Sequence, residues 1–349
     1  MASKSMQLGH AAHTSLWRSF IKSQFCTTPC PPPAGTDLSG QVAIITGSSA
    51  GLGFYCSRHF LSLNLSRLIL AVRSLKKGES AANKLRADYP SAKVDVWVLE
   101  MTSYPSIEAF CRRAQTELTR LDITILNAGT LHLNFSTCST GHEQVMQVNY
   151  LSTFLLAILM LPISKSKAPT GKPGRLTIVS SGTALWAKLP NRDRRPLLAS
   201  FDDPKVQPWD PTERYWSSKM LGHLFFVKML DYLNVDDVIV NMVEPGMCKG
   251  SGLHRDVKGF GAVVLNFMKA VAGRRPEDGA WMYVDAAVVK GKESHGCFCM
   301  DWEIHPFTEL VYLPEGQPII NALWEETMVE LEFAGVHEIL LKFKKGEVA

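Results

Sequence analysis

An excess of charge of one sign is absent from this sequence. The chain carries 37 lysine and arginine residues against 33 aspartate and glutamate residues, for a formal net charge of +4, and the two signs are scattered along its length. A protein that binds DNA or RNA through the phosphate backbone concentrates positive charge on one face or in one segment. The charge pattern therefore excludes nucleic acid as an expected partner.

Metal-binding cysteine patterns are also missing. The eight cysteines stand at irregular spacings, without a pair of CxxC motifs or the histidine spacing of a zinc site. Cys297 and Cys299 come closest to a pair, but a strand there places both side chains on one face without further ligands. We therefore expect buried, reduced thiols and no bound metal.

A hydrophobic run long enough to span a bilayer is lacking. The most apolar stretch, Tyr150–Ile163, has about fourteen residues, whereas a transmembrane helix needs roughly 20. It is better explained as a buried helix. We expect no transmembrane span and a cytoplasmic protein.

The first 36 residues contain no acidic side chain. This pattern fits a mitochondrial presequence, a helix in peripheral contact with a membrane surface, or a short amphipathic arm packed on the domain. We assign residues 1–38 to an N-terminal arm and residues 39–349 to the main domain. The arm contains three basic residues, three apolar residues at helical spacing and a proline run that ends any helix: Lys4, Arg18 and Lys22; Trp17, Phe20 and Ile21; and Pro31–Pro33.

After the arm, short β-rich segments alternate with longer helical ones, which predicts a parallel sheet covered on both faces. With 349 residues and 46% hydrophobic side chains, the chain is long enough for one large α/β domain or two small ones. We expect a single α/β domain with a Rossmann-like, doubly wound parallel sheet of about seven strands. The insertion Asn191–Pro211 is expected to lie on the surface near the site. The expected strands are Gln41–Thr46, Arg67–Val72, Lys93–Leu99, Ile123–Asn127, Arg175–Ser180, Val238–Val243 and Gly296–Asp301.

A glycine-rich turn follows the first strand. It has the sequence TGSSAGLG (Thr46–Gly53) and leads into a helical stretch. Gly47 permits the tight turn, Gly51 lets the backbone approach a pyrophosphate, and Gly53 allows close helix packing. The helix N-terminus attracts the phosphate charge. Strand, turn and helix in this order predict a dinucleotide site.

The spacing of this turn resembles the cofactor fingerprint of the short-chain dehydrogenase/reductase family, Thr-Gly-x-x-x-Gly-x-Gly. The resemblance extends from about Gln41 to the C-terminal helix and implies the same fold. It further implies that the turn contacts a nicotinamide dinucleotide through Gly47, Ser49, Gly51, Leu52 and Gly53.

Residues after the next strands indicate the type of cofactor. An NAD-dependent enzyme presents an acidic residue to the ribose 2′-hydroxyl at the end of the second strand, but this sequence has Arg73 there and Lys77 nearby. These cations predict NADP(H), with an ordinary solvated basic turn as the alternative. By resemblance, Glu100 stands where the family usually has an aspartate that holds the adenine amine, and Asn127 begins the family's Asn-Ala-Gly signature on the adenosine side.

A tyrosine and a lysine four residues apart form the candidate catalytic pair, Tyr215 and Lys219. Hydride transfer between nicotinamide and a carbonyl carbon needs a proton for the developing alkoxide. Tyrosine, with a pKa of about 10, is too basic to supply it efficiently unaided. On one helix face, the lysine ammonium can stabilise phenolate and lower this pKa.

The family resemblance supplies the remaining expected roles. Ser181, at a strand end, would hold the substrate oxygen, and Asn149, at the head of the apolar helix, would organise a water relay to the lysine. Pro245 and Gly246 match the turn beside the nicotinamide. The hydroxyl that usually follows five residues after this proline is replaced by Gly250.

The substrate side is rich in apolar residues. Residues 251–275 are glycine-punctuated and apolar, and we expect them to form a mobile cover over the site. Leu185, Trp186 and Trp209 are further candidates to line the pocket or, for the aromatic residues, to pack on a neighbour. The chain resembles the retinol-dehydrogenase-type branch of the family and, more closely, fungal reductases of polyketide or terpenoid pathways.

We therefore expect an NADP(H)-dependent oxidoreductase that interconverts a carbonyl and an alcohol on a bulky lipophilic small molecule, as a monomer or homodimer. A membrane-associated retinoid- or lipid-type dehydrogenase and a non-catalytic nucleotide-sensing scaffold on the same fold are the alternatives. The presence of Asn149, Ser181, Tyr215 and Lys219 together favours the enzyme over the scaffold.

Overall fold

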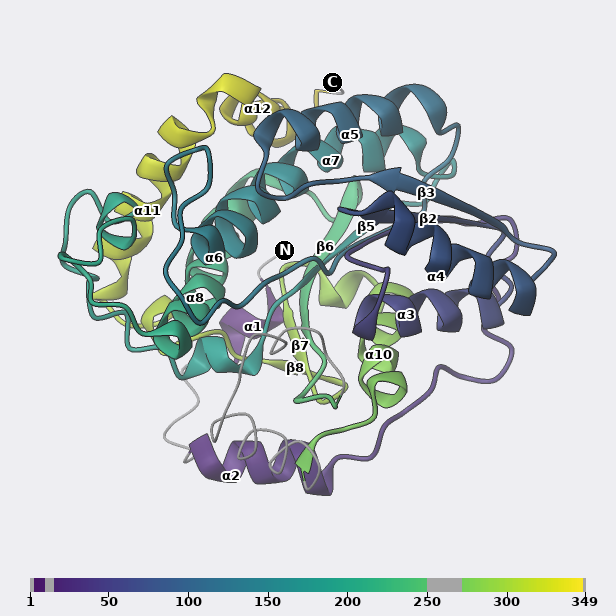
Figure 1. The fold of residues 1–349 in the computed structure, drawn as a ribbon, viewed down its shortest axis with the longest axis horizontal. Coiled ribbons are helices and arrows are strands. Elements are labelled where there is room, and N and C mark those ends of the chain that lie inside the picture. Colours follow the sequence, from purple (N-terminus) through teal and green to yellow (C-terminus); the bar gives the residue numbers. More distant parts are fainter. Residues whose placement is uncertain (1–2, 10–15, 250–271, 348–349) are drawn as a thin grey trace.

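In the part of the chain that the structure describes, eight strands form one sheet (Figure 1). The structure is a computed structural model that describes residues 3–9, 16–249 and 272–347. The strand order is β3-β2-β1-β4-β5-β6-β7-β8, so the direction of winding reverses beside β1, where ligands of open α/β sheets bind. The strands are β1 (Val42–Thr46), β2 (Arg67–Val72), β3 (Lys93–Val98), β4 (Ile123–Leu126), β5 (Gly174–Val179), β6 (Val238–Glu244), β7 (Phe298–Met300) and β8 (Glu303–His305).

The expected α/β class with a parallel sheet is confirmed, with one addition at the edge. Every residue of β1, β4 and β6 is buried, as their continuous apolar runs predict. The eighth strand, β8, is antiparallel to β7 and is not predicted by the sequence. A strand of three residues is too short to show a periodic pattern in the sequence. The turn before β8 places Asp301 and Trp302 at φ values of 53° and 64°, whereas glycine or asparagine is the usual sequence signal of such a turn.

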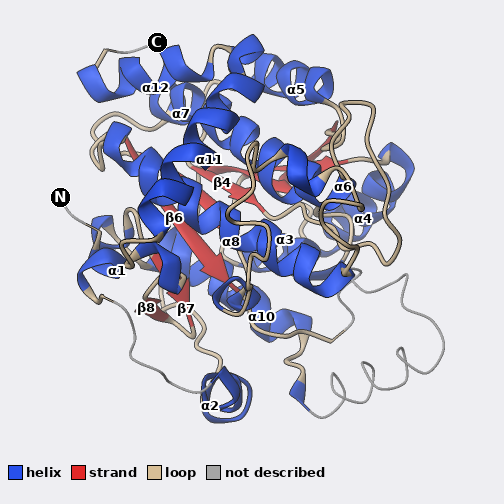
Figure 2. Cartoon of the chain, turned by 90° about the vertical axis from the view of Figure 1, so that its left-hand side faces the viewer, coloured by secondary structure: helices blue, strands red, loops and turns tan. Residues whose placement is uncertain are grey.

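Helices cover both faces of the sheet (Figure 1, Figure 2). On one face lie α3 (Gly51–Ser62), α4 (Leu75–Asp88) and α10 (Pro276–Val284). On the other face lie α5 (Tyr104–Glu117), α7 (Ser152–Lys167) and α8 (Pro211–Met229), with α11 (Gly316–Glu330) packed on α8 and α12 (Val336–Lys345) packed on α7.

The apolar stretch around Tyr150 belongs to one continuous helical segment, Gln144–Lys167. It consists of α6 (Gln144–Met146), the π-helical turn η2 (Gln147–Leu151) and α7. The segment is long and apolar enough to cross a membrane, but 89% of its most apolar window is buried inside the protein. A helix that is apolar on all sides is expected in a core, and here it packs against α5, α12 and the sheet.

Helix α8 is fixed at both ends. Asp210 caps its first turn by accepting a hydrogen bond from the backbone N–H of Thr212 at 2.9 Å, and Pro211 occupies the first helical position, where no N–H is needed. Near its other end, the ring of Phe225 stacks on Trp324 of α11 with centroids 5.0 Å apart. These contacts hold the helix that carries the candidate catalytic pair.

The insertion Asn191–Pro211 is not a surface excursion throughout, contrary to expectation. Leu197 is 0% exposed. The backbone N–H groups of Leu197 and Leu198 both donate to Glu326 of α11 at 2.7 Å. The insertion has no helical or strand periodicity, and its carboxylate partner is far away in the sequence, so its burial depends on the fold.

The N-terminal arm packs on the domain, which was one of the three alternatives for this segment. Ser5 Oγ accepts a hydrogen bond from the backbone N–H of Phe298 at 2.9 Å and donates to the carbonyl of His305 at 2.7 Å. Ser3 Oγ donates to the carbonyl of Gly296 at 2.5 Å. These bonds tie the start of the arm to β7 and β8. The described helical segments of the arm are α1 (Lys4–Gln7), α2 (Leu16–Ile21) and the π-helical turn η1 (Lys22–Cys26).

His142 connects three segments of the fold through its two ring nitrogens. Nδ1 lies 2.8 Å from a carboxylate oxygen of Asp202, and Nε2 lies 3.1 Å from one of Glu330. Burial alone would lower the pKa of His142, but hydrogen bonds to the two carboxylates and their negative charges together raise it to about 9. The imidazolium is therefore favoured in the folded protein.

We predict that charged His142 stabilises the fold below pH 6.5 and that this contribution disappears as the pH rises through about 9, because the folded pKa lies above the unfolded one. His142→Gln should lower the free energy of unfolding by roughly 1–3 kcal/mol at about pH 6 and by much less at about pH 10. Urea unfolding of both proteins at both pH values measures the difference. An equal loss at the two pH values would contradict the assignment.

Candidate active site

In the glycine-rich turn between β1 and α3, Gly47 and Gly53 stand where a side chain would be crowded. Gly47 and Gly51 have left-handed φ values of 65° and 59°, which favour glycine. A Cβ atom at Gly53 would lie 2.6 Å from Asn127 Nδ2 and 2.9 Å from the Gly47 carbonyl oxygen. Because α3 begins at Gly51, the first N–H groups of this helix are available at the turn. The turn therefore has the form of a phosphate cradle.

Asn127, which follows β4, holds this turn in place. Its Nδ2 donates to the carbonyl of Thr46 at 2.8 Å, and its Oδ1 accepts a hydrogen bond from the hydroxyl of Tyr283 at 3.0 Å. The backbone N–H of Ala128 also donates to Thr46 Oγ1 at 2.8 Å. The side chain thereby connects β1, β4 and α10, so the asparagine fixes the geometry of the cradle.

The two cations expected to recognise a 2′-phosphate lie near the end of β2. The side chain of Arg73 is 58% exposed, and its Nε lies 3.8 Å from an oxygen of Glu100. The other oxygen of Glu100 accepts hydrogen bonds from the N–H and hydroxyl of Thr102 at 3.0 and 2.9 Å. Lys77 lies in the first turn of α4, whose N-cap is Ser74. An exposed ion pair of this kind costs little to exchange for a contact with phosphate.

Ser181, Tyr215 and Lys219 meet at the carboxyl ends of β5 and β6. Ser181 Oγ accepts hydrogen bonds from Thr183 Oγ1 at 2.9 Å and from the Thr183 N–H at 3.3 Å, and it is also hydrogen-bonded to the hydroxyl of Tyr215. Lys219 Nζ donates to the carbonyl of Val179 at 2.9 Å and lies 6.0 Å from the centroid of the Tyr215 ring. The expected constellation is therefore assembled in space.

Burial controls the protonation of this pair. It raises the pKa of Tyr215 to about 12, although the hydrogen bond with Ser181 acts in the opposite direction. Burial also lowers the pKa of Lys219 to about 8. The expected lowering of the tyrosine pKa by lysine is thus not seen in this structure, where desolvation of the phenol has the largest effect on that pKa. Both groups are held towards their uncharged forms.

Asn149 lies in the π-helical turn η2, a type of helix irregularity that often occurs at functional sites. Its Oδ1 accepts a hydrogen bond from the N–H of Thr130 at 2.8 Å, and its Nδ2 donates to the Thr130 carbonyl at 2.9 Å and to Ser218 Oγ at 3.1 Å. A Cβ atom at Gly129 would lie 3.3 Å from Asn149 Oδ1 and 3.8 Å from Lys219 Nζ. Asn149 and Lys219 therefore border a common space that the glycine leaves open.

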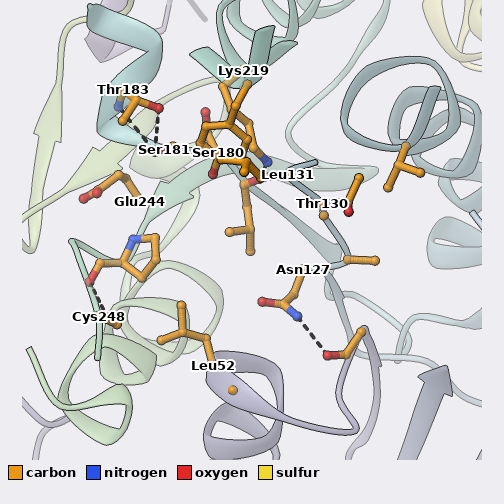
Figure 3. Close-up of a pocket in the computed structure, with 18 of the residues that line it drawn as sticks. Leu52, Asn127, Thr130, Leu131, Ser180, Ser181, Thr183, Lys219, Glu244 and Cys248 are labelled. Carbon is orange, nitrogen blue, oxygen red and sulfur yellow. Dashed lines mark hydrogen bonds between the residues drawn. The ribbon is translucent and has the colours of Figure 1, made fainter. Parts of the chain in front are cut away.

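A cavity of about 890 Å³ brings most of the predicted site residues together. Figure 3 shows Leu52 and Asn127 on one side of it and Ser181 and Lys219 on the other. Gly53 packs inside the glycine turn and Asn149 is bonded beside Gly129, and neither is part of the described lining. The predicted residues that line the cavity are Gly47, Ser49, Gly51, Leu52, Arg73, Lys77, Glu100, Asn127, Ser181, Tyr215, Lys219, Pro245 and Gly246.

Two of the three loop residues considered for the substrate side, Leu185 and Trp186, line this cavity. Trp209 does not; its ring packs against Phe135 with centroids 5.6 Å apart, and its Nε1 donates to the carbonyl of Leu133 at 2.6 Å. The sequence does not show which carbonyl receives the indole N–H, and this bond decides where the ring goes. Of the expected cover, residues 251–271 lie outside the described residues, as does Gly250.

The sequence gives little indication that the N-terminal arm lines the same cavity. Ser19, Phe20, Ser23 and Gln24 all belong to the lining. The helical spacing that includes Phe20 is the one available signal, and it indicates a helix without showing what the helix covers. The partners that hold the arm come from the far end of the sequence, so this contribution follows only from the fold.

Glu244, the last residue of β6, brings a carboxyl group to the cavity. Glu244 is 7% exposed. Burial raises the pKa of its carboxyl group to about 7, and the negative charge of Asp301 acts in the same direction. The positive charge of Arg274 and hydrogen bonds from the N–H groups of Gly246 and Gly182 act in the opposite direction. The family motif directs attention to the Pro-Gly pair that follows, whereas the fold shows that this glutamate is also part of the site.

The described residues fit a nicotinamide dinucleotide. A Cβ atom at Gly53 would collide with Asn127 and Gly47, which indicates close packing of the helix on the turn, and the helix N-terminus at Gly51, which lines the cavity, is suited to a phosphate group. The same cavity then extends to Tyr215 and Lys219. A phenol at the far end of a dinucleotide site can transfer a proton to a bound carbonyl oxygen.

Solved structures share this fold. Pseudomonas aeruginosa RhlG, in an NADP active-site complex, aligns with 80% of this chain and 98% of its own at 20% sequence identity and a TM-score of 0.58. L-sorbose reductase from Gluconobacter frateurii, complexed with NADPH and L-sorbose, aligns with 78% of this chain and 97% of its own at 19% identity and a TM-score of 0.56. At these identities the likeness concerns the fold.

Comparison at the sequence level goes further. The short chain dehydrogenase family model matches residues 41–189. The short chain dehydrogenase/reductase mfmJ of Annulohypoxylon moriforme is 55% identical over 93% of this chain and 94% of its own length, and the short chain dehydrogenase virL of Hypocrea virens is 40% identical over 95% of each. Both organisms are fungi, and the expected resemblance to fungal reductases is confirmed. The chain belongs to the short-chain dehydrogenase/reductase family of oxidoreductases.

Proposed function

We propose that this protein is an NADP(H)-dependent oxidoreductase that interconverts a carbonyl and an alcohol on a bulky lipophilic small molecule of fungal polyketide or terpenoid metabolism. The observation that carries the proposal is the cavity in which Ser181, Tyr215 and Lys219 meet beyond a glycine turn shaped for a dinucleotide. The fungal relatives, named as short chain dehydrogenases, support the oxidoreductase activity.

The side chains have separate roles in the proposed reaction. Bound NADP(H) supplies or accepts the hydride. Ser181 holds the substrate oxygen, and Tyr215 donates a proton to it as negative charge develops there during reduction. Lys219, with a pKa of about 8, is largely protonated at neutral pH and stabilises the negative charge left on the phenol. Tyr215 then regains a proton through Lys219 and the space bordered by Asn149.

A lipophilic substrate is supported by the walls of the cavity. Leu133, Leu185, Trp186 and Trp216 line it near the candidate catalytic residues. Apolar walls with a few convergent polar groups are typical of small-molecule sites, because burial supplies affinity and the polar groups fix orientation. The same walls would suit the retinoid- or lipid-type alternative, which differs in its cellular setting and shares the chemistry.

We also propose that the protein acts in the cytoplasm with its arm retained. Ser3, Ser5 and Ser23 of the arm are buried, at 7%, 0% and 6% exposure. Removing the arm as a presequence would expose the partners of Ser5 on β7 and β8 and the partners of Ser3 and Ser23 beside these strands. This supports the packed arm over a cleaved targeting segment.

Tyr215→Phe is predicted to keep NADPH affinity within about threefold and to lose turnover by on the order of 10²- to 10⁴-fold, because it removes the proton donor and little else. The measurement is NADPH oxidation with the most active member of a panel of aromatic aldehydes and ketones, together with fluorescence titration of NADPH. Tyr89→Phe, at the end of α4, is the control and should behave as the wild type. Normal turnover of the Tyr215 variant would favour a non-catalytic scaffold.

Lys219→Ala is predicted to lose at least as much turnover and, unlike the tyrosine variant, to weaken NADPH binding. The reason is that the ammonium both stabilises the phenolate and, by family resemblance, contacts the nicotinamide ribose. The same two assays test this, with Lys228→Ala near the other end of α8 as the matched control. Wild-type NADPH affinity and turnover in the Lys219 variant would refute both roles.

Arg73→Ala is predicted to weaken NADPH binding about tenfold or more and to change NADH binding by less than about twofold, because a guanidinium can make charge-assisted hydrogen bonds to the 2′-phosphate that NADH lacks. Titration of both cofactors gives the ratio of dissociation constants. Lys76→Ala is the control, since Lys76 is an exposed neighbour in α4 that is not among the described lining residues. An unchanged ratio in the Arg73 variant would show that this arginine is only a surface cation.

A further inference from the structure

Three aromatic rings from distant parts of the chain meet in the cavity. Phe20 of the arm packs edge-on against Trp186, with centroids 6.2 Å apart and planes at 63°. Trp186 in turn packs edge-on against Trp216, at 5.8 Å and 88°. Trp216 directly follows Tyr215, so the row of rings ends beside the candidate proton donor. We call these three residues the aromatic row.

The rings of the aromatic row are incompletely buried, unlike those of the core. Phe20, Trp186 and Trp216 have intermediate exposure and line the cavity, whereas Phe225 in the core is 0% exposed. Edge-on packing leaves part of each ring surface uncovered, and that surface borders the cavity. Rings that served only to fill the interior would be covered on all sides.

The arm is anchored where Phe20 enters the cavity. Arg274 donates to the carbonyl of Ser23 and pairs with Asp301 at 2.7 Å, and Ser23 Oγ donates to the same carboxylate at 2.8 Å. The side chains of Arg274 and Asp301 are only 4% and 9% exposed. In the orientation that satisfies both its polar groups, the amide of Gln24 accepts a hydrogen bond from the N–H of Met247 at 3.1 Å.

This anchoring fixes the position of Phe20 relative to the catalytic residues. If the arm left, buried Arg274 and Asp301 would each lose a hydrogen bond that they make with Ser23, so the arm at Ser23 has little freedom to leave. Met247 follows Gly246 in the Pro-Gly turn, so the arm is attached to the same turn that borders the expected nicotinamide position. The arm is therefore part of the wall of the site.

We propose that Phe20, Trp186 and Trp216 form a substrate subsite for a planar aromatic or conjugated ring, and that Phe20 is a specificity-determining residue supplied by the arm. The proposal rests on the proposed function, and it names the substrate class of the same site. Aromatic rings attract one another through complementary faces and edges when their centroids are 4.5–7 Å apart. A saturated ring system with the same carbon skeleton is thicker and lacks this electrostatic match.

The test compares naphthaldehyde with its fully hydrogenated counterpart, decalin carbaldehyde, as substrates for NADPH oxidation by the full-length protein. The wild type should favour naphthaldehyde by about tenfold in kcat/KM. In Phe20→Ala and Phe20→Leu, the ratio of kcat/KM for naphthaldehyde to kcat/KM for decalin carbaldehyde should fall close to one. The fall should come from a higher KM for naphthaldehyde, with KM for NADPH unchanged. Phe20→Leu retains an apolar side chain on the arm, so it separates loss of the ring from loss of bulk.

Phe25→Ala is the matched control, because Phe25 lies on the same arm and is 55% exposed. It should leave the preference as in the wild type. Equal effects of Phe20→Ala on both aldehydes, or no effect on either, would overturn the subsite. So would a wild type that shows no preference.

A binding measurement separates this proposal from the proposed function. Calorimetric titration with naphthalenemethanol, in the presence of NADP⁺, should show weaker binding in both Phe20 variants than in the wild type and in Phe25→Ala. One outcome is that the wild type and Phe25→Ala bind this ligand more tightly than both Phe20 variants while the wild type oxidises no NADPH. In that case the subsite stands and the proposed reaction fails. If all variants bind alike, the subsite is refuted whatever the turnover.

Discussion

Burial of a lysine ammonium at the end of β5 is the constraint on which the rest of the structure depends. Lys219 is 8% exposed, and its Nζ is bonded to the carbonyl of Val179. A buried charge needs a fixed partner, so α8 must lie against the sheet at one height and one rotation. Three further contacts hold this helix in position: the N-cap at Asp210, the stacking of Phe225 on Trp324 and the packing against the long apolar segment Gln144–Lys167.

Buried charged groups gather at the carboxyl edge of the sheet, whereas large clusters of apolar side chains lie under the helices on its two faces. Glu244, with a pKa raised to about 7, and the buried pair Arg274 and Asp301 all lie at the ends of β6 and β7 or against them. Desolvation makes each of these groups unfavourable without its neighbours, and the apolar helices on both faces offset this cost. This division is expected of a functional site, where local stability gives way to chemistry.

Features with a local cause could be predicted from the sequence. The parallel strands follow from continuous apolar runs, and the glycine turn follows from backbone conformations that Gly47 and Gly51 adopt readily. The pair Tyr215 and Lys219 follows from helix geometry, since residues four apart share one face. The sequence therefore places these features to within a few residues, and most of the predicted cofactor residues share one cavity.

Features that depend on a distant partner could not be predicted in the same way. Trp209 is directed by the carbonyl of Leu133, and Leu197 is buried because Glu326 accepts its N–H. The pKa of Tyr215 rises because the whole site is buried, an effect that motif spacing does not contain. The sequence identifies the candidate catalytic residues more readily than the surroundings that shift their pKa values.

The anchored arm has a consequence for the order in which the protein is made. Ser3 leaves the ribosome well before its partner Gly296, which lies 293 positions later, and Ser23 precedes Arg274 by 251 positions. The segment from β1 to β6 already contains the glycine turn and the candidate catalytic pair, but its cavity lacks the wall that the arm supplies. A growing chain therefore contains its candidate catalytic residues before the cavity wall at Phe20 can form, because the arm can take its place only after Arg274, β7 and β8 have been synthesised.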